Sequence, residues 1–115
     1  MAKVHFPNGE ILEVDVAKNF LSRLKGLSGC KEKKAMLFCF PVPGFWSFWM
    51  PAMHYPLSML FLNSDGKVVD IKHAVPLSRD PKTWKIYVPC ALCKYVLETP
   101  FNHNVSIGDK LKLEF

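Results

Sequence analysis

A chain of 115 residues falls within the commonest size range for one domain, so we expect residues 1–115 to fold as a single domain around one core. Half of the residues are hydrophobic and 13% are aromatic, which excludes an intrinsically disordered chain. The chain has 15 Lys and Arg against 10 Asp and Glu, but no nucleic-acid-binding motif accompanies this basic charge, so a nucleic-acid partner is not expected. No apolar signal segment opens the sequence, which favours a soluble, cytoplasmic protein.

The first predicted elements are a β-hairpin and a helix. Asn8-Gly9 can take the positive φ angles of a tight turn, so residues 3–6 and 10–16 are expected to pair across it. From Ala17 onward, apolar residues recur at helical spacing, which predicts one short helix that ends at Gly26 or Gly29.

Residues 35–64 contain no Asp, Glu, Lys or Arg, and this stretch is long enough to suggest a membrane span. Prolines argue against a span, because a proline inside a helix removes a hydrogen bond and clashes with the preceding turn. The breaking residues are Pro41, Pro43, Gly44, Pro51 and Pro56. The pieces between them, 35–40, 45–50 and 57–62, have the length and two-sided apolarity of buried strands, so an integral membrane protein is not expected.

The second half of the chain predicts further short strands separated by turns. Residues 63–66, Asn-Ser-Asp-Gly, have the composition of a hairpin turn that returns the chain through residues 67–73. Residues 84–88, 93–98 and 110–115 complete the strands. This pattern predicts a mostly β fold, an antiparallel barrel-like or sandwich domain with one short helix.

The sequence contains no familiar catalytic motif. It lacks the glycine-rich loops of nucleotide-binding proteins and the G-x-S-x-G of hydrolases, and we expect no cofactor. The four histidines form no metal-binding pair, and only His54 stands out, because it interrupts an apolar stretch. Glu98 follows an apolar strand, so it is either a strand-end residue satisfied by backbone or a lysine, or a candidate acid or base in a cleft.

Cys90 and Cys93 form a C-x-x-C pair, which can be a redox dithiol, half of a zinc site or a local disulfide. A redox cysteine typically begins a helix, whereas a strand is predicted after this pair, so thiol exchange is not expected. Zinc would need Cys30 and Cys39 as further ligands, and they lack the spacing of a second pair. A stabilising disulfide and inert buried thiols remain as alternatives.

The densest aromatic run, residues 45–50, allows two interpretations. One is core packing, because aromatic side chains bury large areas. The other is an apolar surface or pocket wall that contacts a ligand or partner. The candidate ligand-binding residues are Trp46, Ser47, Trp49, Met50, His54 and Glu98.

Several short motifs, in their order along the chain, resemble the domain of unknown function 192 family. They are Arg23-Leu24-Lys25-Gly26-Leu27, Met36-Leu37-Phe38, Ser47-Phe48-Trp49-Met50, Pro56-Leu57, Asp65-Gly66-Lys67-Val68-Val69, Ala74-Val75-Pro76, Tyr95-Val96-Leu97-Glu98 and Gly108-Asp109. The resemblance covers essentially the whole chain, and its most specific part is the Ser-Phe-Trp-Met element with the Pro-Leu that follows. It implies a small β domain whose biochemical role is not established.

The chain differs from the family pattern where polar residues typically stand. Pro51-Ala52-Met53 replaces Lys-Asn-Thr after the Trp-Met step, and Ser58 stands where the family favours Asp. Residues 99–102 lack the glycine that the family places after the Leu-Glu step. These differences favour binding over catalysis in this chain.

The sequence therefore predicts a small, soluble, non-catalytic binding or interaction module. It would use the aromatic apolar surface around residues 46–54 to bind a small molecule or a protein. The alternative is an enzyme or metal-binding protein built on Glu98, His54 and the cysteines.

Overall fold

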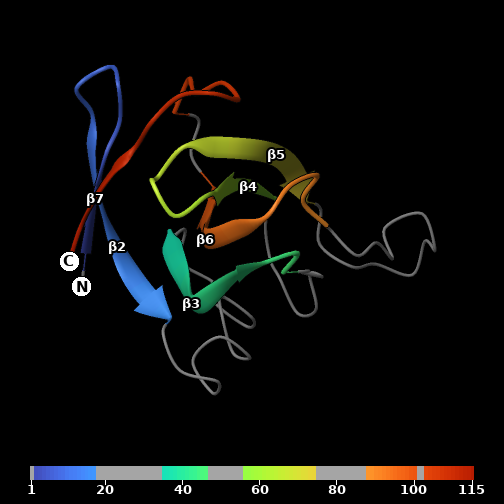
Figure 1. Ribbon diagram of the computed structural model, residues 1–115. Helices are drawn as coiled ribbons and strands as arrows, with labels where there is room; N and C mark the ends of the chain where they lie inside the picture. The colour runs from blue at the N-terminus through green and yellow to red at the C-terminus, as the bar shows by residue number, and fades with distance from the viewer. Residues whose placement is uncertain (1, 18–34, 47–55, 75–87, 101–102) are drawn as a thin grey trace.

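The computed structural model describes residues 2–17, 35–46, 56–74, 88–100 and 103–115 (Figure 1). These residues form seven strands and no helix, which confirms the mostly β prediction. The strands are β1 (Ala2–His5), β2 (Ile11–Ala17), β3 (Met36–Gly44), β4 (Leu57–Leu62), β5 (Val68–Ala74), β6 (Cys93–Thr99) and β7 (Lys112–Glu114). The predicted helix after Ala17 and residues 84–87 of a predicted strand lie outside the described residues.

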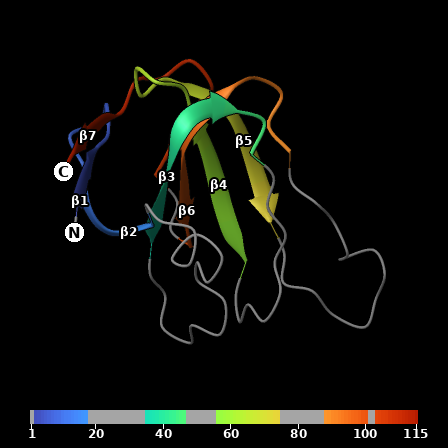
Figure 2. The same ribbon diagram turned by 60° about the horizontal axis from the view of Figure 1, so that its bottom comes forward.

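The strands form one sheet in the order β5-β4-β6-β3-β2-β1-β7. Neighbouring strands are antiparallel except β2 and β3, which run parallel and align Asp15 with Met36 and Ala17 with Phe38. Figure 1 shows the sheet curled into a half-barrel, and Figure 2 shows β3, β6, β4 and β5 side by side. The barrel-like prediction is therefore confirmed, with one parallel pair inside an otherwise antiparallel sheet.

Both predicted hairpin turns are present, and each uses a glycine with positive φ. Gly9 has φ 93° in the turn between β1 and β2, and Gly66 has φ 83° in the turn between β4 and β5. The side-chain oxygen of Asn63 accepts hydrogen bonds from the N–H groups of Asp65 and Lys67, at 2.9 and 3.0 Å, which fixes the second turn locally.

The two ends of the curled sheet meet at a seam between residues 66–68 and 108–111. The N–H of Leu111 donates to the carbonyl of Gly66 at 2.9 Å, and the N–H of Val68 donates to the carbonyl of Asp109 at 2.8 Å. The N–H of Gly108 returns a bond of 2.8 Å to the carbonyl of Val68. In Figure 1 the C-terminal chain crosses from the β5 edge to β7 along this seam.

Strand β3 corrects the expectation that Pro41 ends this strand, since β3 continues through Pro43 to Gly44. The register with β6 is irregular over this part, passing from the pair Cys39–Tyr95 directly to the pair Gly44–Cys93. The parallel pairing with β2 has already ended, with Phe38 as its last β3 residue. Pro41 and Pro43 therefore lie where β3 has no regular pairing with a neighbouring strand, so their lack of an N–H costs few hydrogen bonds. Prolines within sheets typically occur at such bulges or edges.

The sheet buries an apolar cluster on each face. The inner face, inside the curl, joins β1, β2, β3, β4 and β6 through Val4, Phe6, Val14, Leu37, Leu60, Leu62, Leu97 and Leu111. The outer face carries Ala17, Phe38, Phe40, Leu57, Met59, Phe61, Cys93 and Val96. Strand β4 contributes to both clusters, as its uncharged sequence predicted. In the described residues we find no helix long and apolar enough to cross a membrane.

Candidate functional site

Three polar residues lie in one row across the end of the sheet. Ser58, near the start of β4, is aligned with His73 on β5 and with Thr99 at the end of β6. Aligned residues of an antiparallel sheet project from the same face. The next row inward on this face consists of Leu60 and Ile71, which are also aligned. A polar row therefore lies directly above an apolar one on the inner face.

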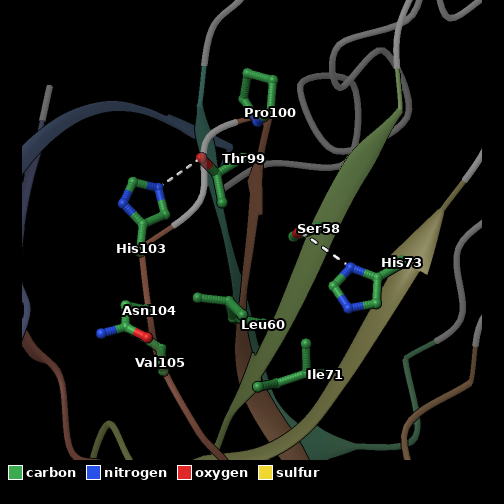
Figure 3. Close-up of a pocket in the computed structure, with 9 residues that line it drawn as sticks. All are labelled: Ser58, Leu60, Ile71, His73, Thr99, Pro100, His103, Asn104 and Val105. Atoms are coloured by element: carbon green, nitrogen blue, oxygen red, sulfur yellow. Dashed lines mark hydrogen bonds between the residues drawn. The ribbon is translucent and has the colours of Figure 1, made fainter.

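A cavity of about 290 Å³ opens over these two rows (Figure 3). Its far wall is the segment 103–105, which is not part of a strand. Asn104 in this segment adopts a left-handed conformation with φ 53°. We call this space the histidine cavity, and it is lined by Ser58, Leu60, Ile71, His73, Thr99, Pro100, His103, Asn104 and Val105.

Both ring nitrogens of His103 are hydrogen-bonded, although the sequence separates the partners widely. Nε2 lies 2.7 Å from the hydroxyl of Thr99, and Nδ1 lies 2.9 Å from the carboxylate of Glu10, in the turn between β1 and β2. The ring also stacks on Phe6, with 4.4 Å between centroids and 13° between planes. These contacts hold the cavity wall against the β1–β2 hairpin.

The partners of His103 determine its tautomer. An ionised carboxylate only accepts hydrogen bonds, so Nδ1 carries the proton that Glu10 accepts. Nε2 of the neutral ring is then an acceptor, and the hydroxyl of Thr99 donates to it. This hydroxyl–imidazole–carboxylate order is that of a catalytic triad. Thr99 is 0% exposed, however, so a substrate cannot reach its oxygen in this arrangement.

The second imidazole, His73, is exposed and lies across the cavity from His103 (Figure 3). Its Nδ1 is 3.3 Å from the hydroxyl of Ser58, which is partly buried on the neighbouring strand. Ser58 stands at the position where the family pattern favours Asp. The cavity therefore has one hydroxyl–imidazole pair on each side, one accessible and one buried.

Sequence reasoning placed the candidate site elsewhere, and the described residues test only part of it. Trp46 packs on the outer face, where its ring stacks on Phe40 with 4.5 Å between centroids and its Nε1 donates to the carbonyl of Val42 at 3.1 Å. Phe45 precedes it and is 57% exposed. The other predicted residues of this surface, Ser47, Trp49, Met50 and His54, lie outside the described residues, as do Pro51 and Ala52.

Glu98 is buried in β6, with 4% of its surface exposed, and is aligned with Met36 on β3 and Met59 on β4. Desolvation by burial raises the pKa of its carboxyl group to about 7. Alignment with Met36 and Met59 places it on the outer face, whereas Thr99 next to it faces the histidine cavity. No ion pair joins Glu98 to a lysine among the described residues, so the expected backbone or lysine partner stays a prediction.

The C-x-x-C pair lies at the beginning of β6, with Cys90 in the preceding bend and Cys93 as the first strand residue. Cys90 and Cys93 are thiols that are not joined in a disulfide. Burial raises the pKa of Cys93, and the backbone N–H of Trp46 only partly offsets this effect, so the thiol form is favoured. The described residues contain no group of three His, Cys, Asp or Glu side chains placed to hold a metal ion.

Glu98 and Cys93 lie at opposite ends of β6. Glu98 stands five positions after Cys93 in β6, which is roughly 16 Å along a strand at about 3.3 Å per residue. The structure brings Cys93 next to Trp46 instead. An active centre that uses Glu98 and Cys93 together is therefore ruled out by this geometry.

The residues of the histidine cavity were missed for two different reasons. The turn at residues 63–66 could have aligned Ser58 with His73, but the register shifts between Phe61 and Leu62, and the sequence does not reveal this shift. The contact between Glu10 and His103 spans 93 positions, and no local pattern predicts it.

A second hollow, of about 500 Å³, lies at the opposite end of the inner face. It is bounded by the β4–β5 turn and β7, and its apolar surface comes from Tyr95, Leu113 and Phe115. Although this hollow is larger, no ion pair joins Asp65 to Lys110 or Lys112 among the described residues at its edge, whereas the histidine cavity has hydrogen-bonded pairs on both sides. Converging polar groups over an apolar floor are typical of small-molecule sites.

Comparison with known proteins identifies relatives that match almost the whole chain. The family model DUF192, described as "Uncharacterized ACR", matches residues 3–113. The UPF0127 protein of Pyrococcus horikoshii is 31% identical over 112 residues, covering 87% of this chain and 86% of that protein.

Two solved structures have a similar fold. One, from Sinorhizobium meliloti 1021, is named provisionally as a transcription regulator and matches with a TM-score of 0.81 and 30% identity over 96% of this chain and 90% of that chain. The other, a protein of unknown function from Novosphingobium aromaticivorans DSM 12444, has a TM-score of 0.82 and 23% identity over 96% and 82% of the two chains.

Proposed function

The chain belongs to the DUF192 family of uncharacterised proteins, and from that premise we propose that it is a non-catalytic module that binds a small molecule in the histidine cavity. The observation that carries the proposal is the pair of hydroxyl–imidazole contacts, Ser58–His73 and Thr99–His103, on the sides of one cavity with an apolar floor. A volume of about 290 Å³ is near the lower end of the range for small-molecule sites.

Binding is favoured over catalysis because neither hydroxyl meets the requirements of an activated nucleophile. Thr99 has an oriented imidazole but is inaccessible. Ser58 is accessible, but its 3.3 Å contact with His73 is long, and no described carboxylate orients that ring. The accessible pair, Ser58 and His73, offers polar groups that can orient a ligand over the apolar floor, which is what a specific binding pocket needs.

The aromatic segment remains a second candidate for the binding surface. Its support is a group of exposed apolar side chains, Val42, Phe45, Val88 and Leu92, on two segments that the Gly44–Cys93 pairing brings side by side. Exposed apolar groups in contiguous patches are typical of interaction surfaces. On this reading the bound partner contacts the outer face, at Trp46, and the cavity on the inner face is not used.

An NMR screen of small fragments against the full chain separates these surfaces. We expect the fragment hits to shift the backbone amides of Ser58, Ile71 and His73. Ser58→Leu, which places a bulky side chain in the cavity mouth, should abolish these shifts. Ser64→Leu is the matched control, because Ser64 is exposed in the β4–β5 turn at the other end of the sheet.

The proposal fails if Ser58→Leu binds the hits as well as the unmodified chain. Shifts confined to Val42, Phe45 and Leu92 would assign binding to the aromatic surface instead. Shifts that disappear equally in the Ser64→Leu control would also contradict a site in the histidine cavity.

A further inference from the structure

We propose that the ligand of the histidine cavity is a small organic anion, a carboxylate attached to a short aliphatic chain. This inference rests on the proposed function and specifies its ligand class. Three properties of the cavity support it: the sign of the charge that it can acquire, the separation of polar from apolar lining, and the small volume.

The sign of the charge follows from the lining side chains. Among the nine lining residues there is no Asp, Glu, Lys or Arg, and the two imidazoles are the only side chains that can become charged by protonation. Protonation of an imidazole makes it positive, so any charge on the lining is positive. An organic cation would find no carboxylate on the lining to compensate its own charge, whereas an anion would find the exposed imidazole of His73.

Glu10 engages the buried imidazole from outside the cavity. Its carboxylate already accepts the proton of His103 Nδ1, at 2.9 Å, on the side of the ring away from Thr99. Because Thr99 occupies Nε2, both ring nitrogens of His103 are engaged, and His73 is the imidazole that can donate to a ligand.

The groups that face His73 impose no opposing charge. The residue aligned with it on β4 is Ser58, a neutral hydroxyl. Its neighbour Lys72 contacts Asp70 on the same strand, with 3.4 Å between Nζ and the carboxylate, so these two charges compensate each other. No carboxylate among the described residues pairs with His73, so its ring is available to donate a hydrogen bond to an anion.

The arrangement of the lining matches an anion with a short apolar tail. Ser58 and His73 form the polar row at the mouth, where a carboxylate head can accept hydrogen bonds. Leu60, Ile71 and Val105 form the apolar surface beneath and beside it. The volume of about 290 Å³ suits a head group with a chain of a few carbons, not a long acyl chain.

Four probes of similar size test the ligand class on the full chain: butanoate, butan-1-ol, butylammonium and inorganic phosphate. Each is titrated at pH 6 and pH 8 while the imidazole Cε1–H resonances and the backbone amides are followed by NMR. We expect butanoate to bind at least tenfold more tightly than butan-1-ol or butylammonium. Its affinity should be higher at pH 6, because a larger fraction of imidazole is protonated there.

Substitution of the exposed imidazole tests the assignment of the head group. His73→Gln should weaken butanoate binding at least tenfold and leave the fold intact, which an overlay of amide spectra checks. His5→Gln is the matched control, because His5 pairs with Glu114 on the β1–β7 edge, away from the cavity. It should leave the butanoate affinity unchanged.

The possible failures are distinguishable. If butan-1-ol or butylammonium binds as tightly as butanoate, or phosphate binds and butanoate does not, the carboxylate class is wrong while binding in the cavity stands. An unchanged affinity in His73→Gln also overturns the assignment. If none of the four probes and no fragment shifts the cavity amides, the proposed function itself fails.

Discussion

A buried carboxyl group in the middle of a sheet makes Glu98 the most perturbed acid among the described residues. Only 4% of Glu98 is exposed, its aligned neighbours are two methionines, and desolvation raises its pKa from 4.5 to about 7. Below about pH 7 the carboxyl group of Glu98 is therefore mostly neutral in the folded protein. In the unfolded chain the same group is already ionised above about pH 4.5.

This difference makes stability depend on pH with a defined sign. Below about pH 4.5 the Glu98 carboxyl group is protonated in both the folded and the unfolded chain, so its ionisation does not change the free energy of unfolding. Between about pH 4.5 and 7 the unfolded state loses its proton first, so stability falls as pH rises, by on the order of 3 kcal/mol in total. Glu98→Gln should abolish this fall, and urea unfolding at pH 4.5 and 8 measures it. Glu13→Gln, at an exposed position on β2, should keep the fall seen in the unmodified chain.

At the scale of elements, the seam that closes the curl depends on one glycine. A Cβ on Gly66 would collide with the backbone carbonyl of Leu111, and its φ of +83° is one that side chains with a Cβ rarely adopt. The N–H of the same Leu111 donates a seam hydrogen bond to the carbonyl of Gly66, so a collision here separates β5 from the segment before β7.

Gly9 provides the matched comparison, because it has φ +93° but no atom within 4 Å of a Cβ. Gly9→Ala should lose about 1–2 kcal/mol from backbone strain alone, whereas Gly66→Ala should lose about 3–5 kcal/mol. Urea unfolding measures both losses, and faster amide exchange at Val68 and Leu111 should accompany only the second. Equal losses at the two glycines would show that the seam contributes nothing to stability.

For the whole molecule, the order of the strands predicts an uneven distribution of stability. Strands β4 and β6 are each paired on both sides and bury residues on both faces, whereas β7 has three residues and pairs with β1 alone. Local opening requires fewer broken hydrogen bonds at an edge than at the centre.

Hydrogen exchange should therefore be slowest at central amides such as those of Leu60 and Leu97 and at least a hundredfold faster in β7. Mass spectrometry of peptides covering β4, β6 and β7 checks this difference. Equal protection of β7 and β4 would mean that the seam makes a closed barrel in solution, in place of the half-barrel of Figure 1.

The sequence by itself determined the features that depend on neighbouring residues. Asn63 and Gly66 encode the β4–β5 turn through their own hydrogen bonds and backbone angles, and Gly9 does the same for the first hairpin. The uncharged run that includes β4 indicated a strand buried on both faces, because five of the six β4 residues are apolar and successive residues project to opposite faces. These signals gave the mostly β fold.

Only the tertiary structure decided the parallel pairing of β2 with β3, the path of β3 beyond Pro41, and the histidine cavity. Each depends on which distant segments become neighbours, which a local pattern does not encode. His103 illustrates the reason. Its partners Glu10 and Thr99 lie 93 and 4 positions away, and no sequence pattern marks either of them as a partner of this histidine. The curl of the sheet brings them together, because burying the inner cluster of Phe6, Leu60 and Leu97 pulls the first hairpin onto the strand ends.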